Sequence, residues 1–136
     1  MEEVFSSSDI VSVHTPLNDY TYHLVNEKHF SLMKKGALFI NTSRGAVVDQ
    51  KALTEHLINK DFYAALDVFE EEPVDMNEPL LGIDNFFLQP HKGGPTTNLR
   101  QVITKELLIE ARNFVDNNTE LKNEITKERA QMMSEG

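Results

Sequence analysis

Short apolar runs alternate with polar or glycine-bearing loops over the first 95 or so residues of the chain. The runs occupy residues 10–13, 37–40, 63–66 and 86–88 and are rich in Val, Ile, Phe, Leu and Ala. Apolar runs without alternation are typical of parallel strands that are buried on both faces. The pattern therefore predicts about four parallel strands with helices covering the sheet.

The segment after the first run carries the signals of a helix start. Asn26 is a good N-cap residue, and Val25 and Phe30 stand at the two positions of a hydrophobic staple. Gly36 is placed to end this helix. We therefore expect a helix between the first and second strands.

A second helix is predicted after the second run. Asp49 is its expected N-cap, with Val48 and Leu53 again spaced as a staple. The inner stripe of this helix should consist of Ala52, Leu53, His56 and Leu57. Alternation of strands and helices predicts an α/β fold with a doubly wound layer.

Beyond about Thr96 the apolar positions repeat at helical spacing. One apolar face is expected from Leu99, Val102, Ile103, Leu107, Ala111, Phe114 and Val115. The pair Asn117 and Asn118 interrupts this pattern. The charged tail that follows, residues 119–136, is either a further helix that needs a partner or a frayed end.

Four side chains that could bind a ligand or take part in catalysis lie just past the carboxyl ends of the predicted strands. They are Thr15, Arg44, Asp67 and His91. In open α/β sheets ligands bind at the carboxyl ends of the strands. One edge of the sheet should therefore gather an Arg, a His and several carboxylates.

Composition removes several classes of function. The chain has 136 residues and a formal net charge of −9, which argues against nucleic acid and anionic membrane surfaces as partners. It has no cysteine, so disulfides and a thiol nucleophile are excluded. No signal peptide is visible and the apolar stretches are too short to span a bilayer, so a cytoplasmic protein is expected.

Each candidate residue also has an unremarkable interpretation. Arg44 suits a carboxylate clamp but also a loop brace, and Glu72 lies in an acidic run of the kind that is usually solvated. Asp67 either caps its loop or meets a ligand. His91, between Pro90 and two glycines, is the best lone candidate because imidazole titrates near neutral pH.

The ordered combination of motifs is far more specific. Residues 8–17 read SDIVSVHTPL, residues 33–45 read MKKGALFINTSRG, residues 65–73 read ALDVFEEEP and residues 90–94 read PHKGG. This combination resembles the D-isomer-specific 2-hydroxyacid dehydrogenase family, from about Ser8 to Gly94 and more weakly to about Val115. The resemblance implies half of a doubly wound, Rossmann-type parallel sheet plus a C-terminal helix.

The resemblance also implies roles for individual residues. Arg44 would bind the carboxylate of a 2-hydroxy or 2-keto acid, and His91 would be the acid/base. Glu72 would orient His91 and favour its protonated form. Asp67 would face the nicotinamide carboxamide.

Further cofactor contacts are implied for Thr15, Pro16, Thr42 and Gly94. The implied cofactor is NAD, with NADP not excluded, and no metal site is expected. The substrate would be a small 2-hydroxy or 2-keto acid, and the implied activity is that of an NAD(P)-dependent oxidoreductase.

The chain departs from the family pattern in two places. No Gly-x-Gly-x-x-Gly motif occurs in it, so residues 1–95 are expected to hold the second half of an NAD-binding domain and residues 96–136 a helix and a charged tail. Near His91, Lys92 stands where an apolar residue is usual, Gln89 replaces a common Thr, and Pro95 follows the glycines.

Two functional hypotheses remain open. The first is a dehydrogenase that is incomplete as this chain, and the second is a non-catalytic truncated paralogue that dimerises or binds a partner. A flavodoxin-like receiver is disfavoured because Thr15 and Pro16 occupy the position of its acidic pocket. The edge of the first strand is expected to be covered by self-association, by the C-terminal helix or by a separate N-terminal chain.

Overall fold

A computed structural model describes residues 1–59, 61–117 and 120–133. The chain forms two compact units, one of residues 1–92 and the other of residues 93–132. Each unit is described by itself. Across the described segments, the helices are too short or too polar to cross a membrane.

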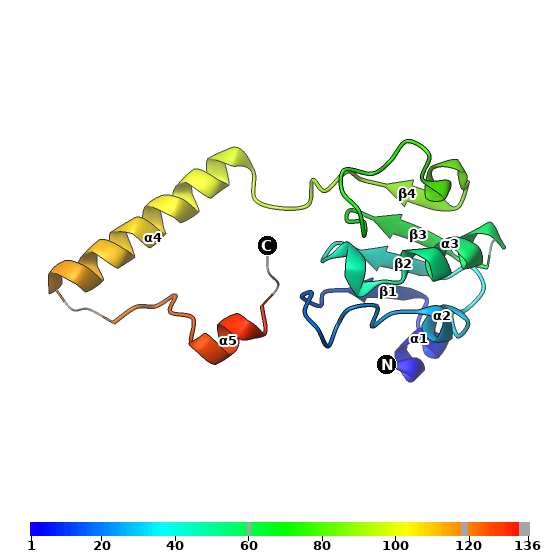
Figure 1. Cartoon of the computed structure of the whole chain (residues 1–136), viewed down its shortest axis with the longest axis horizontal. Coiled ribbons are helices and arrows are strands. Elements are labelled where there is room, and N and C mark those ends of the chain that lie inside the picture. The colour runs from blue at the N-terminus through cyan, green and yellow to red at the C-terminus, as the bar shows by residue number, and fades with distance from the viewer. Residues whose placement is uncertain (60, 118–119, 134–136) are drawn as a thin grey trace. The chain divides into compact units, whose positions relative to one another are not determined.

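The first unit is built on one parallel sheet of four strands in the order β1-β2-β3-β4 (Figure 1). The strands are β1 (Ile10–Val13), β2 (Leu38–Asn41), β3 (Tyr63–Leu66) and β4 (Phe86–Leu88). Each strand therefore lies beside the next one in the chain, and their carboxyl ends share one edge. The expected α/β class, the parallel pairing and the four strand positions are confirmed.

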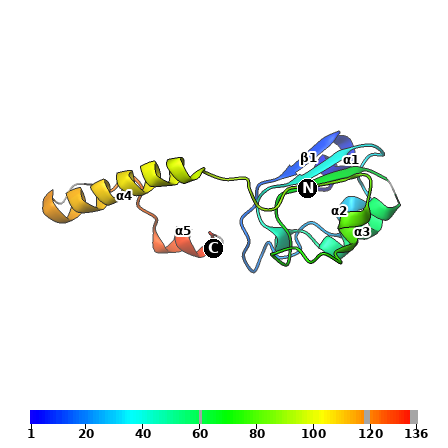
Figure 2. The ribbon, with the colours of Figure 1, turned by 90° about the horizontal axis from the view of Figure 1, so that it is seen from above.

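Helices fill the connections and supply one packing layer. They are α1 (Glu2–Ser7), α2 (Glu27–Phe30) and α3 (Gln50–Ile58), with short 3₁₀ turns η1 (Gly45–Val47) and η2 (Pro79–Gly82). Helices α2 and α3 lie on the same side of the sheet (Figure 2).

The core forms where these helices meet the sheet. The Phe30 ring packs edge-on against Phe39 of β2 at 5.3 Å between centroids and stacks on Phe62 at 5.9 Å. All three side chains are fully buried, so the cluster joins α2 to the middle of the sheet.

Among the described residues of the first unit, no layer covers the opposite face of the sheet, contrary to the expectation of burial on both faces. The in-register side chains on this open face are Ile10, Ser12, Leu38, Ile40, Tyr63, Ala65 and Phe87. Ile10, Tyr63 and Phe87 are 61%, 56% and 64% exposed. The expectation fails because α1 also packs on the helical side, where Phe5 contacts Phe39.

The helix starts follow the sequence signals more closely than the helix ends. Asn26 caps α2 by accepting from the N–H of Lys28, and Asp49 caps α3 by accepting from Ala52. Helix α2 ends at Phe30, so Gly36 does not terminate it. Gly36 has φ of +80° and instead turns the chain into β2, with its N–H bonded to the carbonyl of Asp61.

Two further details differ from the sequence pattern. Helix α1 was not expected, and it is held to the core by Phe5. On α3, Thr54 is buried, whereas His56 of the expected inner stripe is only partly buried. Burial of Thr54 is tolerated because its Oγ1 donates a hydrogen bond to the carbonyl of Gln50.

The second unit consists of α4 (Thr97–Asn117) and α5 (Lys127–Gln131). Helix α4 confirms the predicted C-terminal helix, yet none of its residues, all of them described, is buried. Its apolar face is therefore without a packing layer inside this unit. Glu110 accepts hydrogen bonds from the N–H and the side chain of Asn123, which ties α4 to the following segment. The predicted break at Asn118 lies outside the described residues.

Candidate functional site

The carboxyl ends of β2, β3 and β4 are tied together by backbone hydrogen bonds. The N–H of Asp67 donates to the carbonyl of Asn41 at 3.0 Å, and that of Gln89 donates to Leu66 at 2.8 Å. The loops that leave these strands therefore start from one rigid edge, as the parallel topology requires.

A histidine–carboxylate pair lies on two of these loops. Nδ1 of His91 is 2.5 Å from Oε2 of Glu72, and the other oxygen of Glu72 accepts from the N–H of Phe69 at 3.0 Å. We call His91 and Glu72 the dyad. Because Nδ1 is engaged by the carboxylate, Nε2 is the nitrogen left for a substrate, and the His91 side chain is 47% exposed.

The surroundings of Glu72 favour the ionised form of its carboxyl group. Partial burial acts to raise the pKa of its carboxyl, but the hydrogen bonds from His91 and from the Phe69 N–H outweigh this effect. The pKa of Glu72 therefore lies below its ordinary value. The carboxyl of Glu72 is thus kept in its ionised form beside the His91 ring.

Asp67 positions the backbone on which His91 stands. It is only 5% exposed at the end of β3, and its Oδ1 accepts from the N–H of Lys92 at 2.7 Å. Its carbonyl accepts from the N–H of His91 at 2.8 Å. His91 has φ of +45°, a left-handed conformation uncommon for a non-glycine residue, and these two bonds hold the chain on either side of its Cα.

Arg44 leaves β2 on a turn shaped by Asn41. The buried Asn41 side chain accepts from the N–H and hydroxyl of Ser43 and donates to the carbonyl of Arg44 at 3.0 Å. Arg44 itself is partly buried, and its Nη1 donates to the carbonyl of Ser43 at 2.9 Å rather than to the dyad. The structure thus places Arg44 at the same sheet edge without joining it to His91 or Glu72.

Gly45 lets this turn touch the loop after β3. A Cβ on Gly45 would lie 1.9 Å from the carbonyl carbon of Phe69 and 2.5 Å from the nitrogen of Glu70. Any side chain would push the two loops apart, so glycine is required by space and not by backbone angle. Sequence reasoning missed both Asn41 and Gly45 as site-building residues, although Asn-x-Ser is a known turn signal.

The remaining expected contacts lie around the same edge. Thr15 and Pro16 lie two and three residues after the end of β1, and Thr42 directly follows β2. Thr15 is partly buried, whereas Pro16 and Thr42 are exposed. Gly94 belongs to the second unit.

An apolar cavity of about 540 Å³ borders the dyad. Its walls include Phe69, Val74, Met76, Leu81 and Leu88, and Glu72 and His91 form its charged corner. A mainly apolar hollow with a few converging polar groups is the usual form of a small-molecule site. A histidine–carboxylate pair at the corner of such a hollow can exchange a proton with a bound small molecule.

Comparison with known proteins identifies the family. The profile described as "D-isomer specific 2-hydroxyacid dehydrogenase, NAD binding domain" matches residues 1–93. The chain belongs to the D-isomer-specific 2-hydroxyacid dehydrogenase family. The expected family and its NAD-binding domain are thereby confirmed.

Sequence relatives within this family are considerably longer than the chain. A glyoxylate reductase of Thermofilum pendens is 45% identical over 118 residues, which are 85% of this chain and 33% of that protein. A peroxisomal glycerate dehydrogenase of Arabidopsis thaliana is 48% identical over 92 residues, 67% of this chain and 24% of that protein. The chain thus spans about a third or less of these two relatives.

Solved structures of the family share the fold. The apo form of D-mandelate dehydrogenase from Rhodotorula graminis superposes with a TM-score of 0.84 at 31% identity, covering 93% of this chain and 36% of that one. A D-isomer-specific 2-hydroxyacid dehydrogenase from Xanthobacter autotrophicus, in complex with NADPH and MES, gives a TM-score of 0.81 at 30% identity. The match covers 94% of this chain and 52% of that one.

Proposed function

We propose that this chain supplies the acid/base and substrate-orienting residues for NAD(P)-dependent hydride transfer between a small 2-hydroxy acid and its 2-keto acid. The observation that carries the proposal is the dyad, in which Glu72 binds Nδ1 of His91 and leaves Nε2 for the substrate. In the oxidative direction Nε2 takes the hydroxyl proton as hydride leaves C2. Glu72 stabilises the imidazolium that results.

The residues present suit the nicotinamide end of the cofactor. Asp67 offers a buried carboxylate beside the dyad, and Thr15, Pro16 and Thr42 border the same edge. When bound, the nicotinamide ring accepts or returns the hydride at C2 of the acid. We propose the same role for Gly94, and we propose that residues 1–95 act as the second half of the NAD-binding domain.

We assign Arg44 to the substrate carboxylate. Only Nη1 of its guanidinium is engaged by Ser43, which leaves its remaining N–H donors for a two-pronged contact with a carboxylate. Such a clamp would hold C2 in a fixed position relative to His91. Relatives named glyoxylate reductase and hydroxypyruvate reductase support glyoxylate and hydroxypyruvate as the first acids to test.

The open face supports a second candidate function. Its exposed apolar side chains and the unpaired edge of β1 suit contact with another polypeptide. We propose that this surface is covered by a second copy of the chain or by a completing N-terminal segment. If cofactor binding is absent, the non-catalytic partner-binding function becomes the better interpretation.

The direct test is titration of the purified chain with NADH while following cofactor fluorescence. The chain has no Trp, so energy transfer from that side chain does not complicate the signal. We expect saturable enhancement that weakens in Asp67→Asn and persists in Asp19→Asn, an exposed control of the same chemical change. Absence of saturation at millimolar cofactor would refute nicotinamide binding by this chain.

A further inference from the structure

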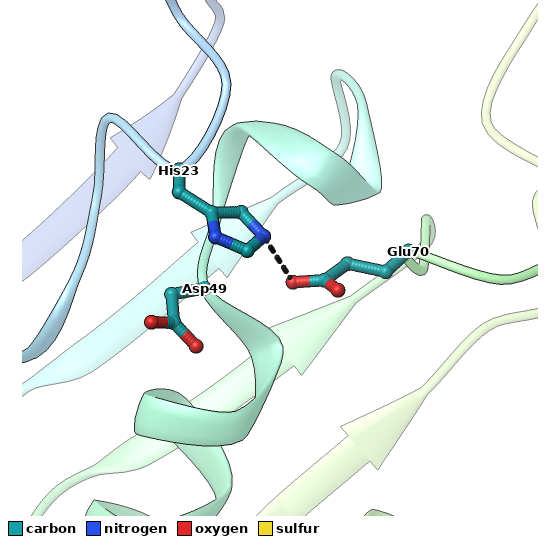
Figure 3. A group of neighbouring side chains, drawn as sticks. All are labelled: His23, Asp49 and Glu70. Carbon is teal, nitrogen blue, oxygen red and sulfur yellow. Dashed lines mark ion pairs between the residues drawn. The ribbon is translucent and has the colours of Figure 1, made fainter.

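A second group of histidine and carboxylate side chains lies apart from the dyad. It consists of His23, Asp49 and Glu70, whose ligand atoms all lie within 4.8 Å of one another (Figure 3). His23 precedes α2, Asp49 caps α3, and Glu70 follows β3. Three loops distant in sequence therefore converge on one point, which we call the trio.

His23 brings a nitrogen with unmet bonding capacity. Its Nε2 is buried and lies 2.8 Å from Oε1 of Glu70, yet among the described residues it makes no hydrogen bond of proper geometry. The ring is held in place by stacking on Tyr22 at 4.0 Å, and its backbone N–H donates to the carbonyl of Ala46. The His23 side chain as a whole is 31% exposed, so the trio lies close to the protein surface.

The two carboxylates are oriented by bonds that leave ligand positions open. Asp49 accepts from the N–H of Ala52 through Oδ1 at 3.0 Å. Glu70 accepts from the N–H of Gln50 through Oε1 at 2.8 Å, and its own N–H donates back to the Gln50 side chain at 3.1 Å. Supporting bonds of this kind fix the direction of metal ligands before the ion arrives.

We propose that the trio binds a divalent transition-metal ion of the Zn²⁺ class, with water completing its coordination. One imidazole nitrogen and two carboxylate oxygens are ligands that Zn²⁺ accepts, whereas Mg²⁺ prefers oxygen alone. The ion also offsets the repulsion between two carboxylates on a chain of net charge −9.

The bound ion has a structural consequence for the dyad. Glu70 stands two residues before Glu72, so fixing Glu70 to His23 and Asp49 restrains the loop that carries the dyad carboxylate. The ion would thus add one shared link among three loops that already meet through hydrogen bonds, such as that from the N–H of His23 to Ala46 and the reciprocal pair between Gln50 and Glu70. This inference does not depend on the proposed hydride transfer, since its readout is metal binding itself.

The simpler alternative is an ion pair between protonated His23 and Glu70. That pair predicts no response to metal and a contact that fades at high salt. The metal site predicts saturable binding that requires the imidazole. Zinc binding therefore separates the two interpretations.

The experiment uses the untagged full chain after treatment with a chelator. Calorimetry and thermal unfolding are recorded with ZnCl₂ and, in parallel, with MgCl₂. We expect one saturable Zn²⁺ site and a Zn²⁺-dependent rise in Tm, with no such rise for Mg²⁺, because binding to the folded state alone stabilises it.

Variants locate the site. His23→Ala and Glu70→Gln should abolish the zinc response, each judged against its own metal-free Tm. Asp49→Asn keeps an oxygen for the α3 cap but replaces a charged ligand by a neutral amide. It should weaken zinc affinity by roughly tenfold or more, since the loss of a group that merely supports a ligand already costs that much. His56→Ala removes another histidine that lies 2.8 Å from a carboxylate, Oε2 of Glu27, and should leave the response intact.

Two outcomes would overturn the proposal. The first is absence of saturable zinc binding in the chelator-treated chain. The second is a zinc response that survives His23→Ala but disappears in His91→Ala, since zinc would then bind at the dyad.

Discussion

At the scale of single residues, the dyad shows how a surface carboxylate acquires a defined role. Glu72 stands in a run of three glutamates, and its neighbours alone do not distinguish it. The Phe69 N–H and His91 engage its two oxygens, one each. Two donors on separate oxygens fix the orientation of the carboxylate, and this fixed anion in turn orients the imidazole.

The lowered pKa of Glu72 should depend on His91. In His91→Ala the hydrogen bond is lost while partial burial remains, so the carboxyl pKa of Glu72 should rise. Titration of the labelled Glu72 carboxyl by NMR measures this directly. A Glu72 that titrates at the same pH in both proteins would show that the dyad contact does not form in solution.

The same contact has a consequence for stability against pH. A carboxyl whose folded-state pKa is depressed stabilises the fold above its unfolded pKa, here 4.5, and this contribution is lost as the pH falls through the folded value. His91→Ala should therefore lose less unfolding free energy between neutral and acidic pH than the unaltered chain. Denaturant unfolding at several pH values checks the sign.

At the scale of elements, the site depends on two loops that touch through their backbones. The turn from β2 carries Arg44, and the loop from β3 carries Glu72. Their closest approach is at Gly45, where no Cβ can be placed beside Phe69. The distance between Arg44 and Glu72 therefore depends on the absence of a side chain at Gly45.

Gly45→Ala should be costly because the clash is with backbone atoms that cannot rotate away. We expect a loss of at least about 2 kcal/mol in unfolding free energy, as for overpacked interior positions. The matched control is Gly82→Ala, where a Cβ meets nothing within 4 Å. That change should stay within about 0.5 kcal/mol, and equal effects in the two variants would contradict the close approach.

At the scale of the whole molecule, the open face and the edge of β1 are the features without a partner inside the first unit. The face carries exposed Ile10 on β1, Tyr63 on β3 and Phe87 on β4. The partly buried Leu38 of β2 lies in register between Ile10 and Tyr63. Contiguous apolar surface of this kind usually marks a contact with another polypeptide. The chain matches about a third of the length of its Thermofilum pendens relative.

We expect the chain to self-associate in a concentration-dependent way through the open face. Ile10→Lys should raise the dissociation constant roughly tenfold or more, equivalent to about 1.4 kcal/mol, because it places a charge in an apolar contact. Tyr20→Lys adds the same charge at an exposed loop residue and should have little effect. Sedimentation velocity checks both, and a monomer at all concentrations would refute the interface.

Local signals in the sequence were sufficient for the strands and for the starts of α2 and α3. Asn26 and Asp49 act on backbone N–H groups two or three residues away, so the caps could be recognised without knowledge of the fold. The four apolar runs became the four strands for the same reason. The family motif paired Glu72 with His91, which are 19 residues apart, and in the structure their side chains are in hydrogen-bond contact.

Tertiary structure alone decided the features that depend on distance between remote segments. Whether the second face of the sheet is covered could not be read from apolar runs, because such runs indicate which side chains avoid water and not whether a covering layer is present. The Gly45 contact and the trio both join loops about 20 or more residues apart, and no local pattern records their separation in space. The amino-acid sequence by itself thus determined the elements and their chemistry, whereas their packing determined which groups meet.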